Sequence, residues 1–226
     1  MNMKYYPVCL DIKGRQALVV GGGLVGARKA STLAKCGANV TIVSPEFTDS
    51  LDNGKKENIT LIKKEYTKKN LNGMFLVIGA TNNAELNRKI WSDAKNKNML
   101  CNIADLPEAC NFILPAIVRR GDLMITVSTS GSSPAFAKKL KKDLEIEFGE
   151  EYAEFLFLMG KIRKKLLAGK HAPDEHKSIF EEFIAKGLLE MIAQKNYSKI
   201  DALLLNILGR GYSYNNLLYT ENENDS

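Results

Sequence analysis

Histidine and paired cysteines are scarce in this chain of 226 residues. The only histidines, His171 and His176, lie five residues apart, not at the i, i+4 spacing that puts two metal ligands on one helical face. The four cysteines, which form no CxxC pair, are Cys9, Cys36, Cys101 and Cys110. This pattern argues against a metal site and predicts reduced thiols that serve as small core hydrophobes.

Long apolar runs are also missing. The longest, between Gln16 and Arg28, has 11 residues against the roughly 20 that a membrane span requires. The start, MNMKYYPVCL, offers neither a long hydrophobic region nor a small-residue cleavage site. We therefore expect no membrane association, no secretory signal and a cytoplasmic location.

The composition is that of a folded protein. Apolar residues make up 45% and charged residues 26% of the chain, which excludes wholesale disorder. The net charge of +6 is unevenly distributed: residues 1–142 hold 22 basic and 11 acidic side chains, whereas residues 143–226 hold 10 and 15. The first part is therefore at +11 and the second at −5, which favours an anionic ligand for the first part.

The first half of the chain alternates short apolar runs with helical patterns. A strand over 17–20, a glycine turn, a helix closing at Gly37 and a strand over 39–43 form a βαβ unit. Further strands are expected at 59–62, 75–78 and 99–103, with a helix over about 83–97. Such alternation predicts an α/β fold with a Rossmann-like, doubly wound parallel sheet.

The pattern changes after Pro107. An apolar segment over 112–118 and a strand over 123–127 precede Ser133–Pro134, a typical helix cap and first turn. The apolar face expected on that helix consists of Phe136, Leu140, Leu144 and Phe148. The chain then stays helical to about Leu208. We expect a nucleotide-binding domain over 1–111, a connecting segment over 112–148 and an all-helical domain over 149–226.

The glycine turn has the GxGxxG spacing of dinucleotide-binding folds and stands between a strand and a helix. Gly21 permits a tight turn, Gly23 has no side chain to block a pyrophosphate, and Gly26 lets helix and strand approach. The N-terminus of the helix presents free N–H groups to the phosphates. The alternative is that these glycines serve only the turn.

The acidic residue that binds the adenosine ribose in such folds is displaced here. The second strand ends at Ser44–Pro45–Glu46, where Glu46 or Ser44 can reach the ribose hydroxyls. No arginine stands nearby to receive a 2′-phosphate, so NAD is favoured over NADP. Glu46 is equally suited to the first turn of a helix.

Five segments together resemble the precorrin-2 dehydrogenase family, which includes the N-terminal module of siroheme synthases. The segments are VVGGGLVGARKA (19–30), VTIVSPE (40–46), GATNN (79–83), CNIADLPEACNFILPA (101–116) and STSGSSPAFAKKL (128–140). Lys29 and the Asn102–x–x–Asp105 element are the most telling parts. Gly26 stands where such proteins often carry Ala, a change that we expect to be harmless.

The resemblance implies an NAD-dependent oxidation of the tetrapyrrole precorrin-2 to sirohydrochlorin, in the route to siroheme and, in some organisms, cobalamin. It also implies a homodimer whose dimerisation segment begins near Phe112. Some relatives also insert iron, so whether ferrous ion is a further substrate stays open. The cofactor contacts that it implies are Gly21, Gly23, Leu24, Val25, Gly26, Ser44, Pro45, Glu46, Thr81 and Asn82.

The resemblance assigns the catalytic role to Asp105, which follows a predicted strand at the edge of the sheet where ligands lie. Asp–Leu–Pro is also a common turn sequence, so a purely structural role is the alternative. Asn102 is a candidate for fixing the Asp105 loop or touching substrate. Ser128 and Thr129, before a helix N-terminus, are candidates for binding substrate carboxylates.

The lysines at 138, 139, 141 and 142, with Arg119 and Arg120, suit a polycarboxylate ligand but are equally typical of a solvated face. No helix-turn-helix, zinc-finger or aromatic single-strand motif supports nucleic-acid binding. Two other functions stay open at this point. One is an NAD-sensing regulatory module without catalysis, and the other is a dehydrogenase of a different small substrate.

Overall fold

The computed structural model describes residues 4–52, 57–104, 106–168 and 173–219. It divides the chain into two compact units, Met1–Leu114 and Pro115–Ser226. Two apolar clusters form the core of the first unit, and a third fills the helical part of the second. Among the helices of these ranges, none is long and apolar enough to cross a membrane.

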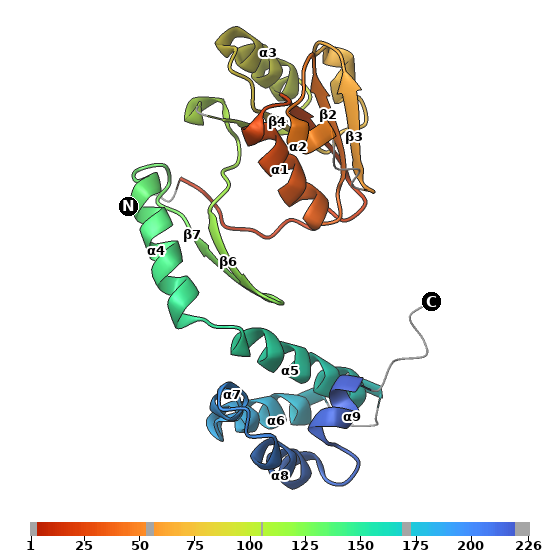
Figure 1. Ribbon diagram of the computed structural model, residues 1–226, viewed down its shortest axis with the longest axis vertical. Helices are drawn as coiled ribbons and strands as arrows, with labels where there is room; N and C mark the ends of the chain where they lie inside the picture. Colours follow the sequence, from red (N-terminus) through yellow and green to blue (C-terminus); the bar gives the residue numbers. More distant parts are fainter. Residues whose placement is uncertain (1–3, 53–56, 105, 169–172, 220–226) are drawn as a thin grey trace. The chain divides into compact units, whose positions relative to one another are not determined.

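The first unit is built on a parallel sheet with the strand order β3-β2-β1-β4-β5. Figure 1 labels β2, β3 and β4 of this sheet. Its strands are Gln16–Val20 (β1), Asn39–Ser44 (β2), Ile59–Lys63 (β3), Leu76–Gly79 (β4) and Leu100–Ile103 (β5). Val, Ile and Leu fill them because both faces of such a sheet are covered. The order reverses beside β1, so the carboxyl ends of β1 and β4 meet at the switch point where ligands of this fold bind.

Helices cover both faces of this sheet. Helix α1 (Leu24–Lys35) buries Ala30 and Leu33 in one apolar cluster, and α3 (Ala84–Lys95) buries Ile90 and Ala94 in the other. The shorter elements are α2 (Asp49–Asp52), η1 (Lys68–Leu71) and η2 (Pro107–Ala109). The predicted doubly wound α/β fold is therefore confirmed.

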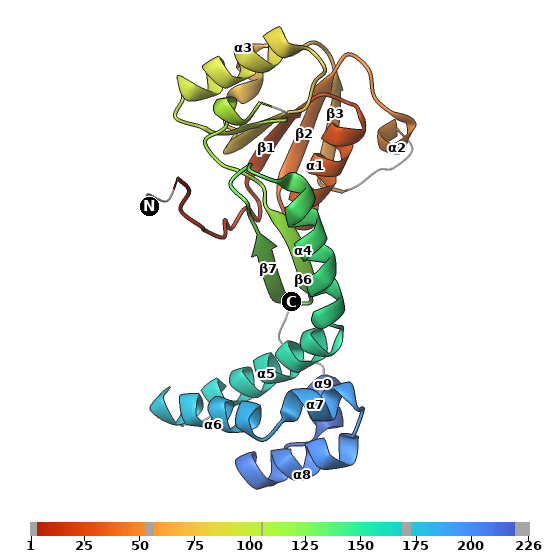
Figure 2. The same ribbon diagram turned by 90° about the vertical axis from the view of Figure 1, so that its left-hand side faces the viewer.

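The second unit begins with an antiparallel ribbon of β6 (Ala116–Arg120) and β7 (Leu123–Val127), along which α4 (Pro134–Glu147) runs (Figure 2). Ser133 caps α4, because its hydroxyl oxygen accepts a hydrogen bond from the Phe136 N–H at 3.2 Å. The expected apolar face of α4 was partly wrong: Phe136 is 51% exposed, and Ala137 is buried instead. A two-stranded ribbon is too narrow to cover the whole apolar face of α4, so Ala137 is buried and Phe136, at the side of that face, is exposed.

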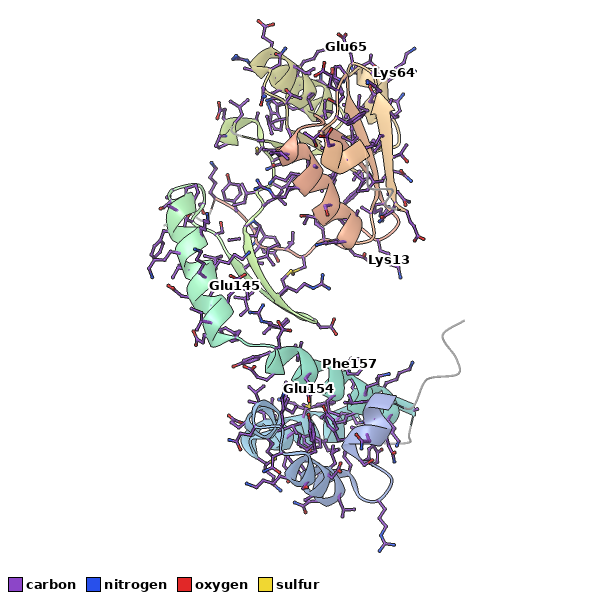
Figure 3. All side chains as sticks on the ribbon, in the orientation of Figure 1. Lys13, Lys64, Glu65, Glu145, Glu154 and Phe157 are labelled. Atoms are coloured by element: carbon purple, nitrogen blue, oxygen red, sulfur yellow. The ribbon has the colours of Figure 1, made fainter. Side chains whose placement is uncertain are left out.

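The rest of the second unit is helical, as predicted. It contains α5 (Glu151–Ala168), α6 (Pro173–Ala185), α7 (Leu188–Ala193), α8 (Tyr197–Leu208) and α9 (Tyr214–Tyr219). The Tyr214 hydroxyl donates a hydrogen bond to Glu154, which Figure 3 labels on α5, and so ties α9 to α5. Helix α9 was not predicted, because six residues are too few for a helical period to show.

The expectation that the cysteines serve as core hydrophobes holds only for part of them. Cys101, in β5, is fully buried and Cys110 is half-buried, whereas Cys9 and Cys36 are exposed. Cys36 ends α1 at the surface, and Cys9 lies in a segment without regular structure, so neither position has a core to enter.

Candidate functional site

The loop between β1 and α1 approaches the end of β4 so closely that only glycine fits at its first position. Gly21 has a φ of +119°, and a Cβ atom there would overlap the carbonyl oxygen of Ala80. The Gly21 N–H donates to the Val43 carbonyl oxygen at 3.0 Å, which also holds the loop to β2. Gly21 therefore performs the tight turn that its place in the motif predicts.

Gly26 lies against the same loop from within α1. A Cβ atom at this position would overlap the carbonyl oxygen of Gly21, and that oxygen belongs to the backbone and cannot turn aside. This backbone therefore requires glycine at position 26, and alanine would clash with the loop. The helix and the loop are closer together than one methyl group allows.

Gly23 differs from these two glycines. It is the N-cap of α1 with an ordinary extended backbone (φ −79°, ψ −180°), and a Cβ atom there would have no neighbour within 4 Å. The fold itself therefore does not require glycine at position 23. An open cradle in front of the N–H groups and positive dipole end of a 12-residue helix suits a phosphate group.

A cavity of about 790 Å³ opens at this edge of the sheet. That volume is in the range of small-molecule and cofactor sites. Its walls come from the segments that follow β1, β2, β3 and β4. The predicted cofactor residues that line it are Gly21, Gly23, Ser44, Pro45, Glu46, Thr81 and Asn82. The cradle at Gly23 and the hydroxyl and carboxylate groups at the end of β2 together fit a dinucleotide.

Three predicted cofactor residues do not line this cavity. Leu24 is 74% exposed and Val25 is also exposed, both in the first turn of α1, and Gly26 is packed behind the loop. What these positions offer to a ligand is the backbone of a helix N-terminus rather than a side chain.

Other lining residues were missed. They are Val20, Gly22, Val43, Phe47, Thr48, Glu65, Tyr66, Ala80, Asn83, Leu86 and Lys89. Figure 3 shows Glu65 and Lys64 at the carboxyl end of β3, and Lys13 at the opposite end of the first unit. The place of Glu65 just after a predicted strand was a usable signal, because the carboxyl ends of parallel strands meet at one edge.

Tyr66 forms a buried part of the cavity wall. Its hydroxyl donates a hydrogen bond to an Asp93 carboxylate oxygen at 3.2 Å. Burial, and then the charge of Asp93, raise the pKa of the Tyr66 hydroxyl well above its usual range. The Tyr66 side chain therefore stays neutral and presents a fixed ring to the cavity.

At the end of β5, side chains hold the next segment against the strand. The Asn102 amide, 9% exposed, donates to the Phe112 carbonyl oxygen at 3.0 Å. The Cys110 sulfur accepts from the Ile103 N–H at 3.2 Å. Asp105 lies outside the described residues, between Ala104 and Leu106. These contacts favour the loop-fixing role for Asn102 over a contact with substrate.

The thiols beside this segment are neutral. Burial raises the pKa of Cys101 to about 12, with a further contribution from the nearby Cys110. Burial is also the largest cause of the raised pKa of Cys110. Because the thiolate is the reactive form of cysteine, neither thiol is suited to act as a nucleophile near neutral pH.

Ser128 and Thr129 lie in the second unit, in the loop before α4. The Ser128 hydroxyl oxygen accepts from the Ser130 N–H at 3.2 Å, and the Thr129 hydroxyl oxygen accepts from the Ser133 N–H at 3.1 Å. Both hydroxyls therefore shape the loop. Each keeps its own proton for a further acceptor, such as a carboxylate.

Within the ranges that the structure describes, no cluster of three or more His, Cys, Asp or Glu side chains could hold a metal ion. His176 is placed on α6, and His171 lies outside those ranges.

Comparison with known proteins gives concordant results for the two units. A family model described as "Putative NAD(P)-binding" matches residues 8–116, and one described as "Sirohaem biosynthesis protein central" matches residues 120–145. The siroheme synthase of Vesicomyosocius okutanii is 36% identical over 87% of this chain and 41% of its own length. That of Methylobacillus flagellatus is 31% identical over 96% and 47%. The chain thus spans less than half of these relatives.

A solved structure matches nearly end to end. SirC, a precorrin-2 dehydrogenase, superimposes with a TM-score of 0.77 and 26% sequence identity. The match covers 90% of this chain and 99% of that protein. It therefore includes residues of both units.

Proposed function

The chain belongs to the family of precorrin-2 dehydrogenases and siroheme synthase N-terminal modules, and from this premise we propose that it oxidises precorrin-2 to sirohydrochlorin with NAD. The observation that carries the proposal is the cavity at the carboxyl edge of the sheet, with the open cradle at Gly23. A cavity suited to a dinucleotide, in a chain whose match to SirC covers 99% of that precorrin-2 dehydrogenase, supports this reaction.

The geometry supports a proposal for the residues that would hold NAD. The backbone of the Gly21–Gly23 loop and the N-terminus of α1 would bind the pyrophosphate, and Ser44 and Glu46 would bind the adenosine ribose. The Thr81–Asn82 turn lines the same cavity. When bound, NAD supplies the hydride acceptor.

The proton released in the same oxidation needs a base. We assign this role to Asp105, which lies outside the described residues and follows β5 in the sequence. The carboxyl end of β5 is at the same edge of the parallel sheet as the cavity. Substrate loses one hydride and one proton, and the carboxylate of Asp105 takes the proton. Ser128 and Thr129 are proposed to bind substrate carboxylates through their remaining hydroxyl protons.

The direct test mixes the protein, NAD and precorrin-2 and follows NADH formation by absorbance. Turnover supports the proposal. NAD binding without NADH formation would contradict it and favour a regulatory sensor, and turnover of a different small substrate would favour another dehydrogenase. Ferrous ion with preformed sirohydrochlorin, added to the same preparation, tests iron insertion.

Glu46 is expected to select NAD over NADP. Its carboxylate can accept hydrogen bonds from ribose hydroxyls and repels a 2′-phosphate. Glu46→Arg is expected to lower the ratio of the NADPH dissociation constant to the NADH dissociation constant by about 10-fold or more. A change of this size corresponds to the free energy of about one charge-assisted hydrogen bond. Glu85→Gln, at an exposed residue in the first turn of α3 that does not line the cavity, is the matched control. An unchanged ratio in Glu46→Arg would reject this role.

We further propose that residues 112–148 mediate a homodimer. This segment exposes Met124 on the ribbon and Phe136 and Ile146 on α4. Large apolar side chains that are exposed on a single chain commonly mark a subunit interface. Sedimentation equilibrium is expected to give twice the chain mass of 25.1 kDa, and a monomer at micromolar concentration would contradict the dimer.

A further inference from the structure

Asn87 is one of three buried polar residues in the described parts of the chain, with Ser44 and Asn102. It lies in the first turns of α3 and is 7% exposed. A buried amide is costly unless its donor and acceptor both find partners. The partners of Asn87 therefore indicate what this residue does.

Both ends of the Asn87 amide contact a single residue, Thr81. The Asn87 Nδ2 group donates to the Thr81 carbonyl oxygen at 2.9 Å, and the Thr81 hydroxyl donates to Asn87 Oδ1 at 2.8 Å. A carbonyl oxygen can only accept, so the nitrogen of the amide must face it and the orientation of the amide is determined. Thr81 is thus held at two points, through its backbone and its side chain.

These bonds extend into the turn that follows β4. The Asn83 N–H donates to the Thr81 hydroxyl oxygen at 3.2 Å, and the Asn83 side chain caps α3 by accepting from the Leu86 N–H at 3.0 Å. Residues 81–83 and the start of α3 therefore form one hydrogen-bonded unit. Thr81, Asn82 and Asn83 all line the cavity, whereas Asn87 does not.

We propose that Asn87 is a positioning residue for dinucleotide binding, which it serves by holding the Thr81–Asn83 turn in its binding conformation. The inference rests on the proposed function. The Thr81 hydroxyl has two acceptors within the protein, Asn87 Oδ1 at 2.8 Å and the Asn83 carbonyl oxygen at 3.1 Å. Its proton is therefore used inside this turn, so Thr81 contacts the dinucleotide through its backbone, and Asn82 provides the exposed side chain. Without Asn87 the turn must be ordered when the ligand binds, and this ordering weakens affinity.

The test measures NADH dissociation constants by fluorescence titration of the full chain. Asn87→Ala is expected to raise the constant about 10-fold, as expected for one lost buried hydrogen-bonding anchor. The KM for NAD should rise by the same factor, while the KM for precorrin-2 and the kcat at saturating NAD stay within about twofold. Asn96→Ala, at the exposed end of the same helix, is the matched control and is expected to bind like the wild type.

Asn87→Asp keeps the volume and the acceptor oxygen for the Thr81 hydroxyl, but its carboxylate cannot donate to the Thr81 carbonyl oxygen and adds a negative charge next to it. We expect it to bind as weakly as Asn87→Ala. Wild-type affinity in Asn87→Asp, or in a folded Asn87→Ala, would overturn the inference. Thr81→Val, which replaces the hydroxyl with a methyl group of similar size, gives a second measure if Asn87→Ala does not fold. Weaker NADH binding supports the inference, and unchanged binding overturns it. A wild-type protein that fails to bind NADH would reject the proposed function itself.

Discussion

Asp105→Asn is expected to lower kcat at least 100-fold and to leave the NADH dissociation constant within twofold of the wild-type value. Asparagine has nearly the same shape as aspartate but cannot take a proton, so only the step that needs a base is lost. General-base catalysis contributes about 10²–10⁴ in rate, and a 100-fold loss is about 2.7 kcal/mol of transition-state stabilisation. NADH formation at saturating NAD and precorrin-2 measures this effect.

The control for this variant is Glu108→Gln. Glu108 is an exposed carboxylate three residues further along the same segment, in η2, and its replacement removes the same charge. We expect a near-normal rate. The wild-type pH–rate profile should have an acidic limb, which Asp105→Asn should lose. A near-normal rate in Asp105→Asn, or an equal loss in Glu108→Gln, would contradict the assignment of the base.

The parallel sheet was predictable because its strands are short runs rich in Val, Ile and Leu, as expected for a sheet that helices cover on both faces. β4, for example, has the sequence LVIG and is buried at every position. Helix α1 was predictable because it follows the glycine turn and ends before Gly37. The short elements α2, η1, η2 and α9 were not, since three to six residues do not complete enough turns to show a period.

The site was predictable only where one residue suffices to indicate its chemistry. Gly21 and Gly23 could be assigned because a positive φ and an open phosphate cradle have a known sequence pattern. Asn87 could not, because an asparagine within a helix has no such pattern. Its role depends on a carbonyl oxygen six residues earlier in the chain, which only the folded turn brings to it.

Tyr66 and Lys89 belong to the same class of missed residues. Each lines the cavity from a separate segment, one after β3 and one on α3. Side chains from such segments come together only through the order of strands in the sheet. Gly26 depends on the fold in a similar way, since whether alanine fits there is set by a distance to the Gly21 backbone that the motif does not specify.

Gly21→Ala is expected to lower the stability of the fold, whereas Gly23→Ala, only two residues away, is expected to lower the affinity for NADH. At Gly21 alanine meets a φ of +119° and the carbonyl oxygen of Ala80, so we expect a loss of at least about 2 kcal/mol in the free energy of unfolding. At Gly23 the backbone is ordinary and the space is open, so the fold should keep its stability. The new methyl group there occupies the phosphate cradle, and the NADH dissociation constant should rise about 30-fold or more, which is about 2 kcal/mol.

Thermal denaturation and NADH titration of both variants separate a structural glycine from a ligand-facing one. Gly160→Ala is the matched control, because Gly160 on α5 also has no neighbour within 4 Å of a Cβ position and does not line the cavity. It should bind NADH like the wild type and be slightly more stable, since alanine favours a helix interior. Gly23→Ala with wild-type affinity would mean that no phosphate enters the cradle. The dinucleotide would then have to bind without the helix N-terminus, and the assignment of the whole cavity to NAD would fail.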